Sequence, residues 1–313
     1  MRGEEWYAGP RLMTNFILPT ARDLALLRLL ELTPVTAAQI KIASVTFPGE
    51  AFRDERRVRE RLQSLIETGF VRKFPVGIDG GGLLHYYRLS REGFRLLHAD
   101  DHEEFHSKAV AEIAPSRFRH AMTTADVMVH ILLAGHQSRI RVLQSHGDSQ
   151  LTLAVGEYRQ QPDCHFQLEH SGKIFNLLFE IDNATEPLNS HREQSIRTKL
   201  LGYEAYQDWV LQAWRENRWG TPRPVFRVVF LTAGIDRAKH ILWLAAKCAR
   251  NPDRHLCYAG IQESFLGEPK ALTLPILNDH HGRWQALVEL QPSSRFLREP
   301  IRLTPPLAPG QVI

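Results

Sequence analysis

The chain has 313 residues, with 43% hydrophobic and 24% charged residues, three cysteines and a formal net charge of +4 at neutral pH. This composition excludes a mainly disordered chain, a disulfide-rich scaffold and a zinc finger, and the apolar runs are too short for a membrane span or a secretion signal. The length favours two domains, because one hydrophobic core rarely grows beyond about 250 residues, and we expect a cytoplasmic protein.

Two capping signals mark the first helices. Residues 1–19 show no period and are predicted to form an N-terminal arm. Thr20 and Asp23 have the spacing of a capping box, and a wide apolar face follows them. Thr36 and Gln39 repeat this spacing before a second, shorter helix. The sequence therefore predicts two successive helices after the arm.

A third helix and two strands are predicted next. The helix spans about 53–68, and its buried stripe consists of Val58, Leu62, Leu65 and Ile66. Strands over 70–74 and 83–89 flank a glycine-rich turn at 79–82. Three helices followed by a hairpin is the order of a winged helix-turn-helix, which we predict over 20–99.

The third helix and the hairpin carry many basic side chains, and the third helix of such a domain normally enters the major groove. We predict that duplex DNA contacts Arg53, Arg56, Arg57, Arg59, Arg61, Arg72, Lys73 and Arg88. Asp54, Glu55 and Glu60 alternate with the helix arginines, so a salt-bridged face exposed to solvent is the alternative. A winged helix can also bind another protein.

After a predicted linker over 100–115, helices and strands alternate. Helices are predicted over 116–136, 188–218 and 236–250. Strands are predicted over 139–145, 163–170, 173–182, 225–231 and 257–261. This order predicts an α/β or α+β domain with a mixed central sheet over 116–265. Residues 266–313 are rich in proline and polar residues, so we expect loops over the core.

The order of helix, three strands, helix and strand is the core of the PD-(D/E)XK nuclease fold. Asp163 begins the second strand and Glu180 lies near the end of the third. That fold brings two such carboxylates together, and their oxygens are the ligands that Mg²⁺ prefers. We therefore predict a Mg²⁺ site at which the metal offsets charge during phosphodiester cleavage. Alternatively, Asp163 caps a turn, Glu180 pairs with a basic side chain, and the domain is an inactive remnant.

The lysine of the nuclease signature is missing from its usual place. That lysine stands two residues after the second acid, where this chain has Asp182. Lys199 is the main substitute, because it lies on the following helix, to which the lysine moves in some proteins of this fold. Lys173 is a weaker candidate, because its turn should lie at the far end of the hairpin. The candidate catalytic residues are Asp163, Glu180, Asp182 and Lys199.

Three segments of the sequence match one family pattern. They are the opening ILPTARDL through VRKFP with its glycine-rich wing, the central PDCHFQLEHSGKIFNLLFEIDNATEP, and the downstream KLLGYEAY. Over about 18–261 the chain resembles the replication-relaxation family of bacterial plasmids and mobile elements. In that family the motif positions correspond to Asp163, Glu180, Asp182 and Lys199, and an aspartate in place of the signature lysine is normal.

The resemblance implies a DNA-binding protein tied to plasmid replication, relaxation or mobilisation, with other proteins of these processes as partners. Three hypotheses remain open at this stage. The protein is a DNA-binding regulator or accessory factor, a Mg²⁺-dependent endonuclease or nickase directed by the winged domain, or a protein-interaction module. A homodimer is also expected, because winged-helix proteins often bind two half-sites.

Overall fold

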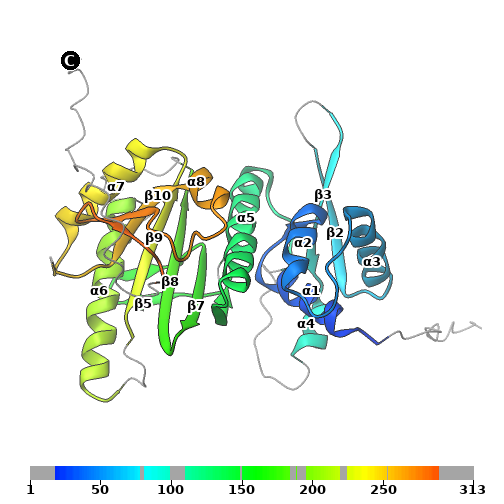
Figure 1. Cartoon of the computed structure of the whole chain (residues 1–313), viewed down its shortest axis with the longest axis horizontal. Helices are drawn as coiled ribbons and strands as arrows, with labels where there is room; N and C mark the ends of the chain where they lie inside the picture. Colours follow the sequence, from blue (N-terminus) through cyan, green and yellow to red (C-terminus); the bar gives the residue numbers. More distant parts are fainter. Residues whose placement is uncertain are drawn as a thin grey trace, which may run out of the picture.

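The computed structural model describes residues 18–77, 81–98, 110–148, 150–183, 188, 195–218, 224–251 and 253–288. Figure 1 shows a smaller N-terminal domain and a larger domain around a central sheet, with one long helix between them. Within the described part of the chain, no helix is both long enough and apolar enough to span a bilayer.

The N-terminal domain combines short helices with a small sheet. Its elements are α1 (Ala21–Leu32), β1 (Val35–Thr36), α2 (Ala37–Ala43), the 3₁₀ helix η1 (Ser44–Thr46), α3 (Glu55–Glu67), β2 (Val71–Gly77), β3 (Leu83–Leu89) and α4 (Arg91–Leu97). The strands lie in the order β1-β3-β2 and pair antiparallel. The predicted three helices and hairpin are present, and β1 is an element that the sequence analysis missed.

Side-chain caps decide where these helices begin. The capping boxes predicted at Thr20 and Thr36 are both formed. Helix α3 begins two residues later than predicted, because Asp54 is its N-cap and accepts a hydrogen bond from the N–H of Arg57 at 3.0 Å. Arg53 therefore precedes the helix, instead of belonging to its first turn.

The larger domain follows the predicted alternation of helices and strands. Its helices are α5 (Pro115–Gln137), α6 (Ile196–Arg215), α7 (Ile235–Cys248) and α8 (Gln262–Gly267). Its strands are β4 (Arg141–His146), β5 (Leu153–Val155), β6 (Tyr158–Gln160), β7 (Cys164–His170), β8 (Lys173–Asp182), β9 (Phe226–Thr232), β10 (Cys257–Ile261), β11 (Leu277–Asp279) and β12 (Trp284–Gln285).

Seven of these strands form one sheet in the order β12-β11-β10-β9-β8-β7-β4. The pairs β8–β9 and β9–β10 are parallel, and the other neighbours are antiparallel. The predicted mixed α and β fold with a mixed central sheet is therefore confirmed. The short hairpin β5–β6 pairs separately and was not predicted.

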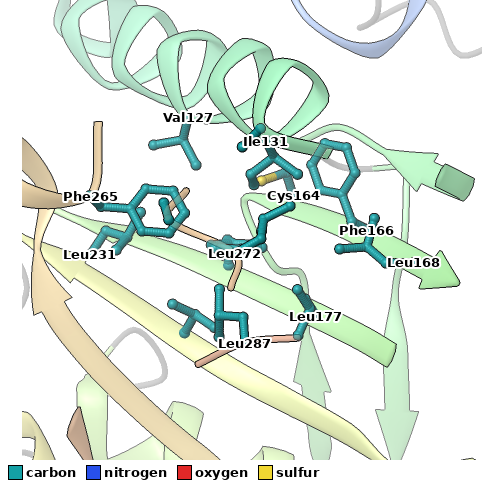
Figure 2. Close-up of a cluster of buried hydrophobic side chains, with 14 of the residues drawn as sticks. Val127, Ile131, Cys164, Phe166, Leu168, Leu177, Leu231, Phe265, Leu272 and Leu287 are labelled. Carbon is teal, nitrogen blue, oxygen red and sulfur yellow. The ribbon is translucent and has the colours of Figure 1, made fainter. Parts of the chain in front are cut away.

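Helices cover both faces of this sheet. Helices α5 and α8 pack on one face around a core that includes Val127, Ile131, Phe166 and Phe265, as Figure 2 shows. Helices α6 and α7 pack on the other face. Because side chains alternate along a strand, neighbouring residues of β8 point to opposite faces. Glu180 points toward α6, and the flanking apolar residues point toward α5.

The segment after residue 265 departs from the loop prediction. Strands β11 and β12 extend the sheet, because Tyr258 of β10 pairs with Asp279 of β11. Leu272 and Leu287 are buried in the same core as α5. The apolar residues of this segment are spaced too irregularly to predict a strand from the sequence. The hydrogen-bonded pairing with β10 is what gives β11 its extended conformation. Residues 289–313 lie outside the described part.

The starts of α6 and α7 also differ from prediction. Helix α6 begins at Ile196 with Ser195 as its N-cap, and residues 189–194 of the predicted helix lie outside the described part. Asp236 does not cap α7. Gly234 occupies the N-cap position without a side-chain hydrogen bond, and Asp236 lies in the first turn of α7, where its charge favours the helix dipole.

Helix α5 belongs to the cores of both domains. Val129 on its second face packs into the core of the N-terminal domain. Asp126 accepts a hydrogen bond of 2.7 Å from Nε2 of Gln39 in α2. Gly147 directly follows β4, and its backbone lies very close to Leu32 of α1. A Cβ atom added to Gly147 would lie 1.8 Å from the Leu32 carbonyl oxygen. The shared helix α5 and this close backbone contact therefore join the two domains. Residues 100–109 of the predicted linker lie outside the described residues.

Candidate functional site

Two carboxylates meet where β7 and β8 lie side by side. Asp163 precedes β7, and its N–H donates to the carbonyl of Phe179 at 3.0 Å. Glu180 is the next residue of β8. The Asp163 carboxylate also accepts a hydrogen bond of 2.6 Å from the N–H of Ile181. Strand pairing therefore brings the two candidate metal ligands together.

Side chains from α6 hold the Glu180 carboxylate. Nζ of Lys199 donates to Oε2 at 2.8 Å, and the hydroxyl of Tyr203 donates to Oε1. The two donors are four residues apart and therefore project from one face of α6. Lys173 lies at the opposite end of β8, paired with His170. Of the two candidate lysines, the structure thus brings Lys199 to the carboxylates.

The surroundings of Glu180 oppose its ionisation. The side chain is only 2% exposed. Burial raises the pKa of Glu180, the charge of Lys199 opposes that increase, and the Asp163 carboxylate adds to it. The two acids therefore repel each other in a nearly dry position, and a cation close to both would relieve that repulsion.

The donor set of this pair suits a Mg²⁺ ion with few protein ligands. Carboxylate oxygens are hard ligands, and Mg²⁺ commonly keeps several waters in place of further side chains. Over the residues that the structure describes, no group of three or more His, Cys, Asp and Glu could hold a metal. An ion bound by Asp163 and Glu180 would take waters and backbone carbonyls as its remaining ligands.

A histidine from α5 contacts the first carboxylate. Nε2 of His120 lies 2.9 Å from Oδ1 of Asp163, and Nδ2 of Asn183 lies 3.3 Å from Nδ1 of His120. The hydrogen bond with Asp163 raises the pKa of His120 and outweighs the opposing effect of burial. His120 was not predicted at the site, because no local motif links it to a residue 43 positions away.

Asp182, at the position of the signature lysine, forms an ion pair with α7. Nε of Arg237 lies 2.5 Å from Oδ2, and Nη2 lies 3.1 Å from Oδ1. The side chains of Arg237 and Asp182 are 17% and 2% exposed. Such a bidentate contact fixes the guanidinium in one orientation. Asp182 therefore ties the end of β8 to the first turn of α7.

The arginines at the start of the candidate recognition helix face solvent. Arg56 and Arg57 each contact Glu60 at 2.9 Å, and Arg59 contacts Glu55. Arg53 is exposed as well. The alternation of charges noted in the sequence thus produces ion pairs along α3. Exposed pairs of this kind contribute little to stability, so the guanidinium groups can exchange partners at low cost.

Lys73 of the hairpin lies on the same side as α3. It is exposed, and its charge acts together with that of Arg59 on the imidazole of His85. Partial burial and these two nearby cations lower the pKa of His85. Lys73 and Arg59 therefore lie near one imidazole, and the exposed face of α3 next to them carries Glu55 and Glu60 as well as its arginines.

Three of the arginines expected at a DNA surface are engaged elsewhere. Arg61 is not on the exposed side of α3, because it points toward α1 and binds the buried carboxylate of Asp23. Arg72 and Arg88 lie on the opposite face of the hairpin from Lys73. Their guanidinium groups donate to backbone carbonyls of residues 110 and 111, at 3.1 and 2.5 Å. These contacts fasten the hairpin to the segment that enters α5.

Comparison with solved structures finds the restriction endonuclease FokI. One structure of this enzyme is 14% identical, with 80% of this chain and 43% of that chain covered and a TM-score of 0.26. A structure of FokI bound to DNA gives 14% identity, 80% and 44% coverage and a TM-score of 0.28. This chain spans less than half the length of those chains.

Comparison with protein families gives a broader match. No curated protein matches the sequence. The model of the family described as replication-relaxation matches residues 26–221, which is more than half of the chain. This segment includes the N-terminal domain from the middle of α1 onward, helix α5, both carboxylates and helix α6. The chain therefore belongs to the replication-relaxation family.

Proposed function

We propose that this protein binds duplex DNA through α3 and the β2–β3 hairpin, which together act as a winged helix-turn-helix. In this proposal it is an accessory factor in plasmid replication, relaxation or mobilisation. The observation that carries the proposal is the exposure of Arg56 and Arg59 on α3, with the exposed Lys73 of the hairpin close enough to act with Arg59 on one imidazole. Membership of the replication-relaxation family supports the biological setting.

The shape and charge of this surface suit a DNA groove. The major groove admits one α-helix, and arginine is the side chain that pairs best with guanine edges and phosphates. The acids that contact Arg56 and Arg59 on α3 are exposed. Because exposed ion pairs are weak, phosphates can replace those acids as partners without a large loss of folding free energy.

The salt dependence of binding tests this proposal. The full chain is titrated against a duplex by fluorescence anisotropy between about 50 and 200 mM salt. If α3 and the hairpin neutralise several phosphates, log K falls linearly against log salt with a slope of about −0.9 per phosphate. A flat dependence, or no binding to duplex DNA, would reject the proposal.

A second candidate function is Mg²⁺-dependent cleavage of a phosphodiester. The observation that favours it is the convergence of Asp163, Glu180 and Lys199 in one place. Asp163 and Glu180 would hold the ion, which when bound offsets negative charge on the phosphodiester. Lys199 and Tyr203 fix the Glu180 carboxylate, and His120 together with the N–H of Ile181 fixes that of Asp163.

Incubation with supercoiled plasmid tests the second function. Metal-dependent nicking by the wild type should disappear in Asp163→Asn and in Glu180→Gln, with DNA binding retained. Glu169→Gln is the matched control, because Glu169 lies near the opposite end of β7 and pairs with Arg141. Nicking that survives in both carboxylate variants would assign it to a contaminant or another site. If the wild type does not nick the plasmid, cleavage is rejected and DNA binding is the function that remains.

A further inference from the structure

An arginine-lined cavity lies on the flank of α3 that faces α1. Its volume is about 360 Å³. Arg22 of α1 and Arg53 before α3 contribute to its wall, together with Arg57 and Arg61 of α3. The wall also contains Glu50 and Glu60, so four arginines stand against two acids. The cavity therefore favours an anionic occupant.

Two of these arginines already have carboxylate partners. Arg61 binds Asp23, whose side chain is 1% exposed. Because that carboxylate is buried, Arg61 is held in the wall of the cavity. Arg57 shares the exposed Glu60 with Arg56, as described above. With these two arginines paired, the remaining charges of the lining are Arg22, Arg53 and the acid Glu50, which leaves a positive excess.

Arg22 is positioned without a carboxylate. Its guanidinium lies 4.6 Å from the centre of the Phe52 ring and donates to the carbonyl of Glu50 at 3.2 Å. Within the described part of the chain, no ion pair is formed by Arg22 or by Arg53. A ring and a carbonyl orient the Arg22 guanidinium while its full positive charge stays available to a ligand.

We propose that this cavity binds a phosphate of the DNA backbone, with Arg22 and Arg53 as its ligands. The proposal rests on the proposed function and adds a contact from α1 that the sequence analysis did not include. When a helix lies in the major groove, its flanks face the sugar-phosphate strands. Arg56 and Arg59 on the exposed side of α3 enter the groove, and the cavity on the adjacent flank takes the phosphate. The fork of an arginine matches phosphate geometry.

Substitutions that remove one charge each test the proposal on the full chain. Arg22→Gln and Arg53→Gln should each make the slope of log K against log salt less steep by about 0.9. The ratio of wild-type to variant DNA affinity should then fall about threefold between 50 and 200 mM salt. The loss should be the same on unrelated duplex sequences, because phosphate contacts carry no sequence information. Arg28→Gln is the matched control, since Arg28 is exposed on α1 and does not line the cavity.

A lysine variant separates loss of contact from loss of fold. Arg22→Lys keeps the charge, so it should restore the wild-type slope while binding more weakly than the arginine. If the wild type binds DNA and the slope is unchanged in both glutamine variants, the cavity proposal is wrong and the α3 proposal stands. A wild type that does not bind duplex overturns both. Saturable binding of inorganic phosphate to the free protein that depends on Arg22, with an unchanged DNA slope, would assign the cavity to a free anion instead.

Discussion

The exposed surface of α3 and the buried carboxylate site use the same kinds of ion pair in opposite surroundings. Arg59 and Glu55 have side chains that are 59% and 40% exposed. Lys199 and Glu180 are 18% and 2% exposed. In water such a pair is weak and exchangeable, whereas in the interior neither partner can leave without stranding a charge. The α3 surface can therefore offer its cations to DNA, and the carboxylate site is held in a fixed arrangement.

The largest effect on stability is expected from breaking the buried pair. Lys199→Met removes the cation that favours the ionised form of Glu180, so the buried carboxyl must either keep its charge unpaired or take up a proton. We predict a loss of about 3 kcal/mol in the free energy of unfolding, measured by urea denaturation. The double variant Lys199→Met with Glu180→Gln should recover part of that loss, because the stranded charge is removed. A single variant as stable as the wild type would contradict the description of Glu180 as buried and paired.

A smaller effect is expected at the contact between β8 and α7. Arg237→Lys keeps the charge opposite Asp182 but cannot reproduce the two parallel hydrogen bonds of the guanidinium. We predict a loss of about 2 kcal/mol in unfolding free energy. Lys239→Arg, at a half-buried position of α7 where Lys239 lies 4.0 Å from the exposed Asp236, serves as the control and should leave stability unchanged. Equal stability of the wild type and Arg237→Lys would show that the two parallel hydrogen bonds from Arg237 to Asp182 do not contribute to folding.

The pH dependence of stability reports on Asp23 in the N-terminal domain. Burial raises the pKa of Asp23, but hydrogen bonds from Arg61 and Thr20 outweigh burial, so the pKa is lowered overall. The folded state therefore favours the ionised form. The wild type should be more stable than Asp23→Asn above about pH 4, on the order of 1 kcal/mol, and this advantage should vanish as the pH falls through the folded pKa. Denaturation curves between pH 2 and pH 7 would show the opposite trend if the carboxylate were protonated when folded.

The smallest effect is expected on α3 itself. Glu55→Gln removes the partner of Arg59 without burying anything. Unfolding free energy should change by less than about 0.5 kcal/mol. DNA affinity should stay equal or rise slightly, because one competing anion is gone. A large loss of stability would show that the ion pairs on α3 stabilise the fold. That result would favour the alternative in which this face of α3 is a salt-bridged surface and does not bind DNA.

The sequence predicted those parts of the molecule that local signals determine. The capping residues Thr20 and Thr36 identified two helix starts, and strand β8 has the predicted bounds Lys173–Asp182. The placement of Lys199 on the helix after the third strand was also predicted, and in the structure it contacts Glu180 from α6.

Contacts between distant residues could not be predicted in this way. His120 and Asp163 are 43 residues apart, and Asp182 and Arg237 are 55 apart. Arg61 looked exposed by helical spacing alone, and only the packing of α3 against α1 shows that it binds Asp23. Periodicity shows which face of an element is polar, but the packing of the elements selects its partner.

Binding of one duplex to three proteins tests the contrast between the two regions most directly. The proteins are the wild type, the triple variant Arg56→Ala with Arg57→Ala and Arg59→Ala, and Glu180→Gln. We predict that the triple variant loses on the order of 100-fold in affinity, since each arginine contributes about 1 kcal/mol or more to binding. Glu180→Gln should bind within about twofold of the wild type. Full affinity in the triple variant, or an equal loss in Glu180→Gln, would contradict the assignment of DNA binding to the exposed α3 surface.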